Sequence, residues 1–121
     1  MAKTILLVED EPLLREVTSE DLQDLGFDTE CARDGDEALQ FLESDRPFVA
    51  LITDIRMPGA CDGWQLAERA RELRPGIPVV YLSGYSDDGP PPVEGAAYVR
   101  KPYRISDIEG ALVKLGLRPS G

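Results

Sequence analysis

Five short apolar runs alternate with amphipathic stretches along the chain, and this alternation constrains the fold more than any other feature. Runs this short are typical of strands, whereas apolar residues spaced three and four apart indicate helices that face a core. The predicted strands cover residues 5–8, 29–32, 49–53, 79–83 and 97–99. Nearly continuous apolar strands that alternate with helices predict the doubly wound α/β class, a parallel sheet with helices on both faces.

Proline and glycine mark the expected ends of the first helix. Pro12 is a favoured first helical position, and Gly26 is expected to stop the helix. The residues expected on its buried side are Leu14, Val17, Leu22 and Leu25.

Three further helices are expected. The second covers residues 34–44, and the third begins at Asp62 and ends before Pro75. The last is expected to begin at Ser106, because the sequence Ser-Asp-Ile-Glu from that residue has the pattern of a capping box.

The segment between the fourth and fifth strands interrupts the alternation. It contains three consecutive prolines, residues 90–92, which are incompatible with an ordinary helix interior. We therefore expect the fourth helix of the pattern, between these strands, to be missing or vestigial, and residues 84–96 to form a loop with a polyproline-like stretch.

Length and composition limit the possible functions. The 121 residues predict a single domain, 1–121, with a short tail at 116–121 and no output domain. The formal net charge of -10 argues against nucleic acid as a direct partner, because phosphate backbones are bound by basic surfaces. The sequence has no histidine, which excludes Ser-His and Cys-His nucleophile pairs. It also has no signal peptide and no apolar stretch of about 20 residues, so we expect a cytoplasmic protein without a membrane span.

Acidic residues follow two of the predicted strands. Glu9 and Asp10 come directly after the first strand, and Asp54 ends the third. If these strands are neighbours in a parallel sheet, the carboxylates meet at one edge and repel one another by about 3 kcal/mol per pair, taking about 5 Å and an effective dielectric of about 20. Such a cluster predicts a bound cation, and oxygen ligands favour Mg²⁺.

Residues at the strand ends, taken together, resemble a known family. They are Glu9, Asp10, Asp54, Met57-Pro58-Gly59, Asp62-Gly63, Ser83-Gly84 and Lys101-Pro102. This set is similar to the receiver domain of two-component response regulators, over essentially the whole chain. The resemblance implies a flavodoxin-like sheet with strand order 2-1-3-4-5. It also implies a signalling phosphoacceptor rather than an enzyme, with only self-catalysed phosphorylation and slow autodephosphorylation.

The resemblance also assigns roles to individual residues. Asp54 would accept a phosphoryl group from a histidine kinase, a histidine phosphotransfer protein or a small donor. Glu9, Asp10, Asp54 and the backbone carbonyl of Arg56 would hold Mg²⁺. Lys101 would pair with Asp54 before transfer and with a phosphoryl oxygen afterwards, and its bond to the following proline is expected to be cis.

Ser83 and Tyr98 resemble the switch pair of such domains. The Ser83 hydroxyl would move toward a phosphoryl oxygen, and the ring of Tyr98 would occupy the vacated space, which changes the surface that a downstream protein target reads. An alternative is that Tyr98 is a half-buried strand tyrosine without a switching role. The chain is expected to be either a stand-alone receiver or one from a hybrid sensor kinase.

Three other functions share some of these sequence features. A haloacid-dehalogenase-like phosphatase needs a second acid two positions after the nucleophile, where this chain has Arg56. A flavodoxin needs a phosphate cradle after the first strand, where the sequence is Glu-Asp-Glu-Pro. A receiver-like binding module that acts without phosphorylation is the remaining alternative, which the intact Asp54 and Lys101 disfavour.

Overall fold

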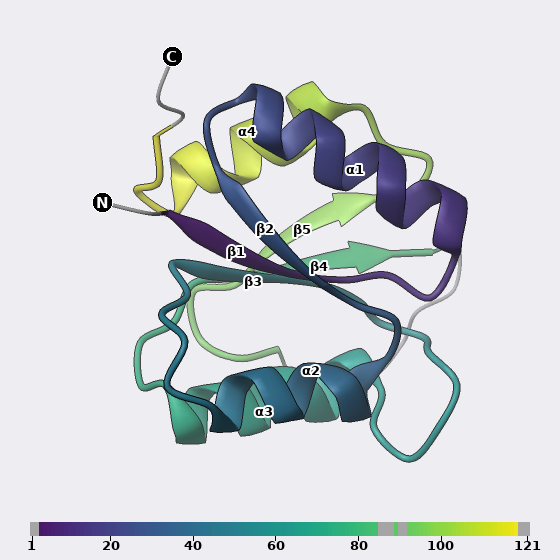
Figure 1. Ribbon diagram of the computed structural model, residues 1–121, viewed down its shortest axis with the longest axis vertical. Coiled ribbons are helices and arrows are strands. Elements are labelled where there is room, and N and C mark those ends of the chain that lie inside the picture. Colours follow the sequence, from purple (N-terminus) through teal and green to yellow (C-terminus); the bar gives the residue numbers. More distant parts are fainter. Residues whose placement is uncertain (1–2, 85–88, 90–91, 119–121) are drawn as a thin grey trace.

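A five-stranded parallel sheet lies between two pairs of helices in the computed structural model (Figure 1). The structure describes residues 3–84, 89 and 92–118. Its elements, in chain order, are β1 (Thr4–Val8), α1 (Pro12–Asp24), β2 (Asp28–Ala32), α2 (Gly35–Glu43), β3 (Ala50–Asp54), α3 (Gly63–Leu73), β4 (Val79–Ser83), β5 (Ala97–Arg100) and α4 (Ile105–Lys114). The strand order is β2-β1-β3-β4-β5, and every pair is parallel. The predicted α/β class and strand order are confirmed.

The two helix layers bury two separate faces of the sheet. Helices α1 and α4 cover one face, and α2 and α3 cover the other (Figure 1). Along β1, Ile5 and Leu7 join the core beneath α1 and α4, whereas Leu6 and Val8 join the core beneath α2 and α3. Successive side chains of a strand point to opposite faces, so a strand with both faces covered is apolar throughout.

The buried side of α1 differs from the predicted one. Leu22 is buried as expected, but Val17 is 47% exposed, and Thr18 and Ser19 are buried instead. The Thr18 hydroxyl lies 2.7 Å from the Tyr103 hydroxyl, and the Ser19 hydroxyl lies 2.6 Å from that of Thr29. These hydrogen bonds satisfy the buried hydroxyls, which apolar periodicity alone does not anticipate.

Helices α2 and α3 begin within one residue of their predicted starts at positions 34 and 62, and in each case the aspartate at that position is the N-cap. The Asp34 carboxylate accepts a hydrogen bond of 2.9 Å from the backbone N–H of Glu37. At α3, Asp62 and Gln65 form a reciprocal capping box, with bonds of 2.9 and 3.0 Å. Both helices are therefore fixed at the end nearest β3 and the residues that follow it.

The predicted capping position of the last helix is two residues too late, because the N-cap is Arg104 and not Ser106. Helix α4 begins at Ile105, and Ser106 is already inside its first turn. The carboxylate of Asp107 accepts a 2.9 Å hydrogen bond from the backbone N–H of Arg104. Asp107 thus has the role that the capping-box pattern gave to the acid two residues later, because the helix starts earlier.

The connection between β4 and β5 contains the segment with the proline run. Its residues 85–88 and 90–91 lie outside the described residues, so the prediction of a missing or vestigial helix falls partly on them. None of the described residues 84, 89 and 92–96 is helical. Residues 119–121 of the predicted tail also lie outside the described part.

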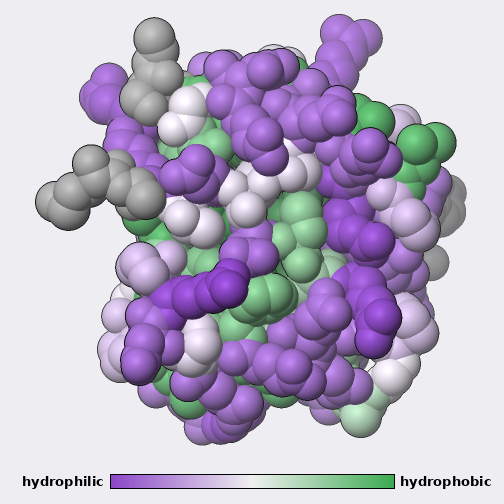
Figure 2. Space-filling view, in the orientation of Figure 1, coloured by the Kyte–Doolittle hydropathy of each residue, from purple (hydrophilic) through white to green (hydrophobic). Residues whose placement is uncertain are grey.

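The surface is mainly hydrophilic. Figure 2 shows hydrophilic residues over most of one face, with hydrophobic residues in small areas between the two helix layers. The larger apolar side chains that are exposed in the described residues are Leu13, Val17, Tyr98 and Val113. Across the described ranges, no helix is both long and apolar enough to cross a membrane.

Gly63 allows the start of α3 to pack directly against the end of β3. A Cβ atom at this position would lie 2.1 Å from the backbone oxygen of Asp54 and 2.6 Å from the Cα of Ile55. The Gly63 N–H also donates a 2.7 Å hydrogen bond to the Ile55 carbonyl. The neighbouring atoms belong to the backbone of a central strand and its exit, so they cannot move aside, and only glycine fits.

We expect Gly63→Ala to lower the free energy of unfolding by roughly 2–4 kcal/mol, because the added methyl group overpacks against backbone. Urea denaturation followed by circular dichroism measures this. Gly110→Ala in α4 is the matched control, since no atom lies within 4 Å of its added Cβ. The control is expected to gain about 0.5–1 kcal/mol from helix propensity. Equal losses in the two variants would contradict the importance of the close approach.

Candidate functional site

Three carboxylates converge at the carboxyl edge of the sheet. β1 pairs with β3 so that Val8 lies opposite Thr53, which brings the following residues, Glu9 and Asp54, to the same edge. One carboxylate oxygen from each of Glu9, Asp10 and Asp54 lies within 4.8 Å of the other two. Glu9 and Asp54 are 0% and 2% exposed, while Asp10 is exposed. We call these three residues the acidic pocket.

Lys101 inserts its ammonium group between the two buried carboxylates. Its Nζ lies 2.5 Å from Asp54 Oδ1 and 3.2 Å from Glu9 Oε2. The Lys101 backbone N–H donates a 2.8 Å hydrogen bond to the Ser83 carbonyl, which holds the end of β5 beside that of β4. The Lys101-Pro102 peptide bond is cis, as the family resemblance implied.

The pKa values of Asp54 and Lys101 are both raised, but for different reasons. Burial, together with the neighbouring Glu9, raises the pKa of Asp54 to about 8, although Lys101 opposes the rise. For Lys101, burial lowers the pKa, but its hydrogen bond and charge interactions with Asp54 and Glu9 outweigh this, so the net shift is upward. Lys101 therefore remains a cation beside the two buried carboxyl groups.

The pocket fits a divalent cation. When all three carboxylates are ionised, as they are once a cation binds, one ammonium group leaves two negative charges for the cation to offset. Glu9 Oε2 and Asp54 Oδ1 are buried side-chain oxygens that face the Lys101 ammonium group. Hard cations such as Mg²⁺ prefer oxygen ligands of this kind. Arg56 lies two residues beyond Asp54 with an exposed side chain, and its backbone carbonyl as a ligand stays a prediction.

Ser83 and Tyr98 lie in neighbouring strands. Leu82 lies opposite Asp54, so Ser83 comes one residue beyond, at the same edge of the sheet as the acidic pocket. Tyr98 is 48% exposed, and its ring lies 5.2 Å from that of Tyr81 between centroids. The structure therefore brings Ser83 to the edge that holds the pocket and places Tyr98 one strand further out. The switching role of the pair stays a prediction.

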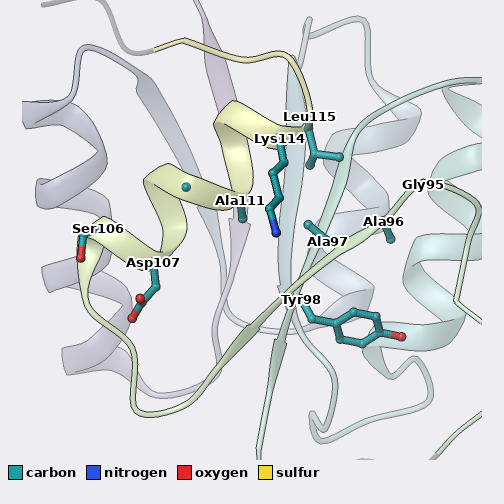
Figure 3. Close-up of a pocket in the computed structure, with 10 residues that line it drawn as sticks. Gly95, Ala96, Ala97, Tyr98, Ser106, Asp107, Ala111, Lys114 and Leu115 are labelled. Carbon is teal, nitrogen blue, oxygen red and sulfur yellow. The ribbon is translucent and has the colours of Figure 1, made fainter.

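A groove of about 660 Å³ lies between β5 and α4 (Figure 3). Lys114 and Asp107 contribute its charged groups from the helix, and the residues just before and within β5 form its other wall. Tyr98 points away from α4 in this view. The residues that line the groove include neither Lys101 nor any member of the acidic pocket.

The sequence analysis did not anticipate that two further aromatic residues lie beside Tyr98. Trp64 in α3 and Tyr81 in β4 stack together, with centroids 4.9 Å apart. Tyr81 sits in an apolar strand and Trp64 in an amphipathic helix, so both have the pattern of ordinary core residues. Only the pairing of Tyr81 with Tyr98 across the sheet reveals that they adjoin a predicted site residue.

Fold and site together define a doubly wound α/β domain with buried carboxylates and a lysine at the carboxyl edge of its sheet. The family model for the response regulator receiver domain matches residues 5–112. The chain belongs to the response regulator receiver domain family. Members of this family are phosphoacceptor domains of two-component signal transduction rather than enzymes.

Similar proteins include both short and long chains. The response regulator receiver protein CpdR of Brucella abortus is 30% identical over 120 residues, which are 93% of this chain and 96% of CpdR. The virulence transcriptional regulatory protein PhoP of Salmonella typhimurium is 34% identical over 97% of this chain, but the match covers only 53% of PhoP. This chain thus spans about half the length of that relative.

Solved structures agree closely with the fold. A response regulator receiver protein from Sinorhizobium medicae has a TM-score of 0.86 and 34% identity, and the match covers 94% of each chain. The receiver domain of the hybrid histidine kinase CckA has a TM-score of 0.80 and 33% identity, with 93% of this chain and 97% of that chain covered.

The raised pKa of Asp54 predicts pH-dependent stability when divalent cations are removed. The folded protein keeps the Asp54 proton up to about pH 8, whereas the unfolded chain releases it near pH ~4. The stabilisation is therefore full below pH ~4 and is lost as the pH rises toward 8. Asp54→Asn has no proton to lose, so at pH 8 it is expected to be more stable than wild type by roughly 1–3 kcal/mol, with little difference at pH ~4.

Urea denaturation in EDTA across this pH range measures the effect. Glu16→Gln is the control, because Glu16 is an exposed carboxylate of α1 outside the pocket. Its curve is expected to follow that of wild type. Parallel curves for wild type and Asp54→Asn would show that the buried carboxyl of Asp54 does not retain its proton.

Proposed function

We propose that Asp54 accepts a phosphoryl group from the phosphohistidine of a histidine kinase or a histidine phosphotransfer protein, and that the change alters binding to a downstream protein. The observation that carries this proposal is the Lys101 ammonium group, held 2.5 Å from Asp54 and 3.2 Å from Glu9 at the edge of the sheet. Family membership supplies the type of partner, and a cytoplasmic location is part of the proposal.

The chemistry is a transfer between two nucleophiles. A carboxylate oxygen of Asp54 attacks phosphorus, the new O–P bond forms, and the N–P bond to the donor imidazole breaks. The imidazole nitrogen leaves with the electron pair and takes a proton from solvent. Because a protonated carboxyl is a poor nucleophile, Lys101 assists by favouring the ionised form of Asp54, and it then faces the negative phosphoryl oxygens.

Glu9, Asp10 and Asp54 are the side chains that would hold Mg²⁺, with the Arg56 carbonyl as a further proposed ligand. When bound, Mg²⁺ offsets negative charge on the transferring phosphoryl group. The buried Glu9 contributes a carboxylate oxygen that faces the Lys101 ammonium group, and the exposed Asp10 contributes one at the pocket's surface.

Ser83 and Tyr98 are proposed as the residues that convert the new charge into a change of surface. Ser83 ends a strand beside Asp54, and Tyr98 is exposed enough to change position. We also propose that no full helix joins β4 to β5, which the proline run and the non-helical described residues support. Residues 1–121 would act as one receiver unit. The matches to CpdR and to the CckA receiver support this, because they cover 96% and 97% of those chains.

Incubation with acetyl phosphate and Mg²⁺, followed by intact mass measurement, is expected to give a single phosphoryl adduct. Asp54→Asn and EDTA should each abolish it, because they remove the nucleophile and the cation. Lys101→Ala is expected to slow adduct formation at least about tenfold, since a preorganised charge at the reacting group is lost.

Lys114→Ala is the matched control, because Lys114 is an exposed lysine in α4 outside the acidic pocket. It should form the adduct at the wild-type rate. An adduct that persists in Asp54→Asn would place the phosphoryl group elsewhere. No adduct on the folded wild type, even with competent kinases, would favour a binding module that acts without phosphorylation.

A further inference from the structure

Three aromatic rings from three different elements pack against one another as tilted and edge-on pairs. They are Trp64 of α3, Tyr81 of β4 and Tyr98 of β5, with centroid distances of 4.9 Å from Trp64 to Tyr81, 5.2 Å from Tyr81 to Tyr98 and 6.4 Å from Trp64 to Tyr98. We call them the aromatic stack. Trp64 is 8% exposed, Tyr81 is fully buried and Tyr98 is 48% exposed, so the stack runs from the core to the surface.

The aromatic stack adjoins the acidic pocket from two directions. Tyr81 lies two residues before Ser83 on β4, and alternate residues of a strand share a face, so the two side chains are neighbours on one side of the sheet. Trp64 directly follows Gly63, where an added Cβ atom would lie 2.1 Å from the backbone oxygen of Asp54. A displacement of Ser83 can therefore be passed to Tyr81, two residues away on β4. A displacement of the Asp54 backbone can be passed through Gly63 to Trp64.

The other side of the stack supports the connection between β4 and β5. The backbone N–H of Val93 donates a 3.2 Å hydrogen bond to the Tyr81 hydroxyl. A Cβ atom at Gly89 would lie 2.2 Å from Nε1 of Trp64, so the backbone there rests on the indole. Val93 and Ala96 also pack against the core cluster that contains Trp64 and Tyr81. These contacts hold the connection at the place where the doubly wound pattern would put a helix.

Packing makes the stack suited to discrete changes. Tyr81 has no exposed surface, and close-packed cores switch between arrangements rather than deform gradually. Burial raises the pKa of the Tyr81 hydroxyl, which therefore stays neutral and available to Val93. Only Tyr98 has free space, so a movement of its ring is the event that the two inner rings can follow.

We propose that Tyr81 and Trp64 are positioning residues that transmit the phosphorylation state of Asp54 from Tyr98 to the connection at Val93 and Gly89, an inference that rests on the proposed phosphoacceptor function. When Ser83 turns toward the phosphoryl group, the Tyr98 ring moves into the vacated space and changes its contact with Tyr81. The Tyr81 hydroxyl then loses its alignment with the Val93 N–H, and the connection is released from the stack. The stack thus serves as the coupling element in place of a packed helix.

Trp64 is the chain's single tryptophan, so its fluorescence reports on the stack alone. The test measures Trp64 emission, exchange of the Val93 amide by NMR, and intact mass on one sample, before and after loading with acetyl phosphate and Mg²⁺. In wild type, loading is expected to change the emission and to speed Val93 exchange roughly fivefold, the factor expected for loss of one neutral hydrogen bond.

Tyr81→Phe keeps the ring and removes only the hydroxyl. Its Val93 amide is expected to exchange fast in both states, and the response to loading should disappear while the adduct yield is unchanged. Tyr103→Phe is the matched control, because that hydroxyl bonds to Thr18 and packs with the core on the other face of the sheet. It should keep both responses, whereas a general loss of stability would affect both variants alike.

The outcomes separate this inference from the proposed function. An adduct in wild type without a change at Trp64 or Val93 would overturn the coupling role and leave the phosphoacceptor intact. No adduct would remove both. If Tyr81→Phe does not fold, Val93→Pro removes the same hydrogen bond from the donor side and should also abolish the Trp64 response. A full response in either variant would overturn the assignment to this bond.

Discussion

The arrangement of the functional site depends most on the contact between Lys101 and the buried carboxylates of Glu9 and Asp54. Two carboxylates with almost no exposed surface repel each other strongly, and an isolated buried charge is far more costly than a paired one. Lys101 directly follows the last strand, β5, whereas Glu9 follows β1 and Asp54 ends β3. The pocket is therefore complete only when the sheet is complete, and formation of the site and of the fold are one event.

Much of this arrangement was predictable because it depends on short-range patterns. Apolar runs predicted the strands, and the starts of two helices were predicted at Asp34 and Asp62, which the structure shows to be their N-caps. Strand-end acids predicted the acidic pocket, since residues that follow neighbouring parallel strands must meet. These predictions needed only the spacing of residues and the rule that parallel strands share a carboxyl edge.

The missed features depend on pairings between distant residues. Thr18 and Ser19 are buried in α1, where Tyr103 and Thr29 supply their hydrogen-bond partners. The local sequence of α1 does not predict these partners. Helix α4 begins earlier than predicted because the Asp107 carboxylate accepts a hydrogen bond from the backbone N–H of Arg104. The aromatic stack could not be predicted for the same reason. Tyr81 has the sequence pattern of an ordinary core residue, and its contact with Tyr98 is known only from the structure.

The contacts between the aromatic stack and the β4–β5 connection have a consequence for how related sequences can diverge. At Val93 the hydrogen bond is donated by the backbone, so as far as that bond is concerned any residue except proline can occupy the position. At Gly89 the indole leaves no room for a side chain. Position 93 can therefore vary among residues that keep the backbone N–H and pack on the core cluster, whereas position 89 is restricted to glycine by the indole of Trp64.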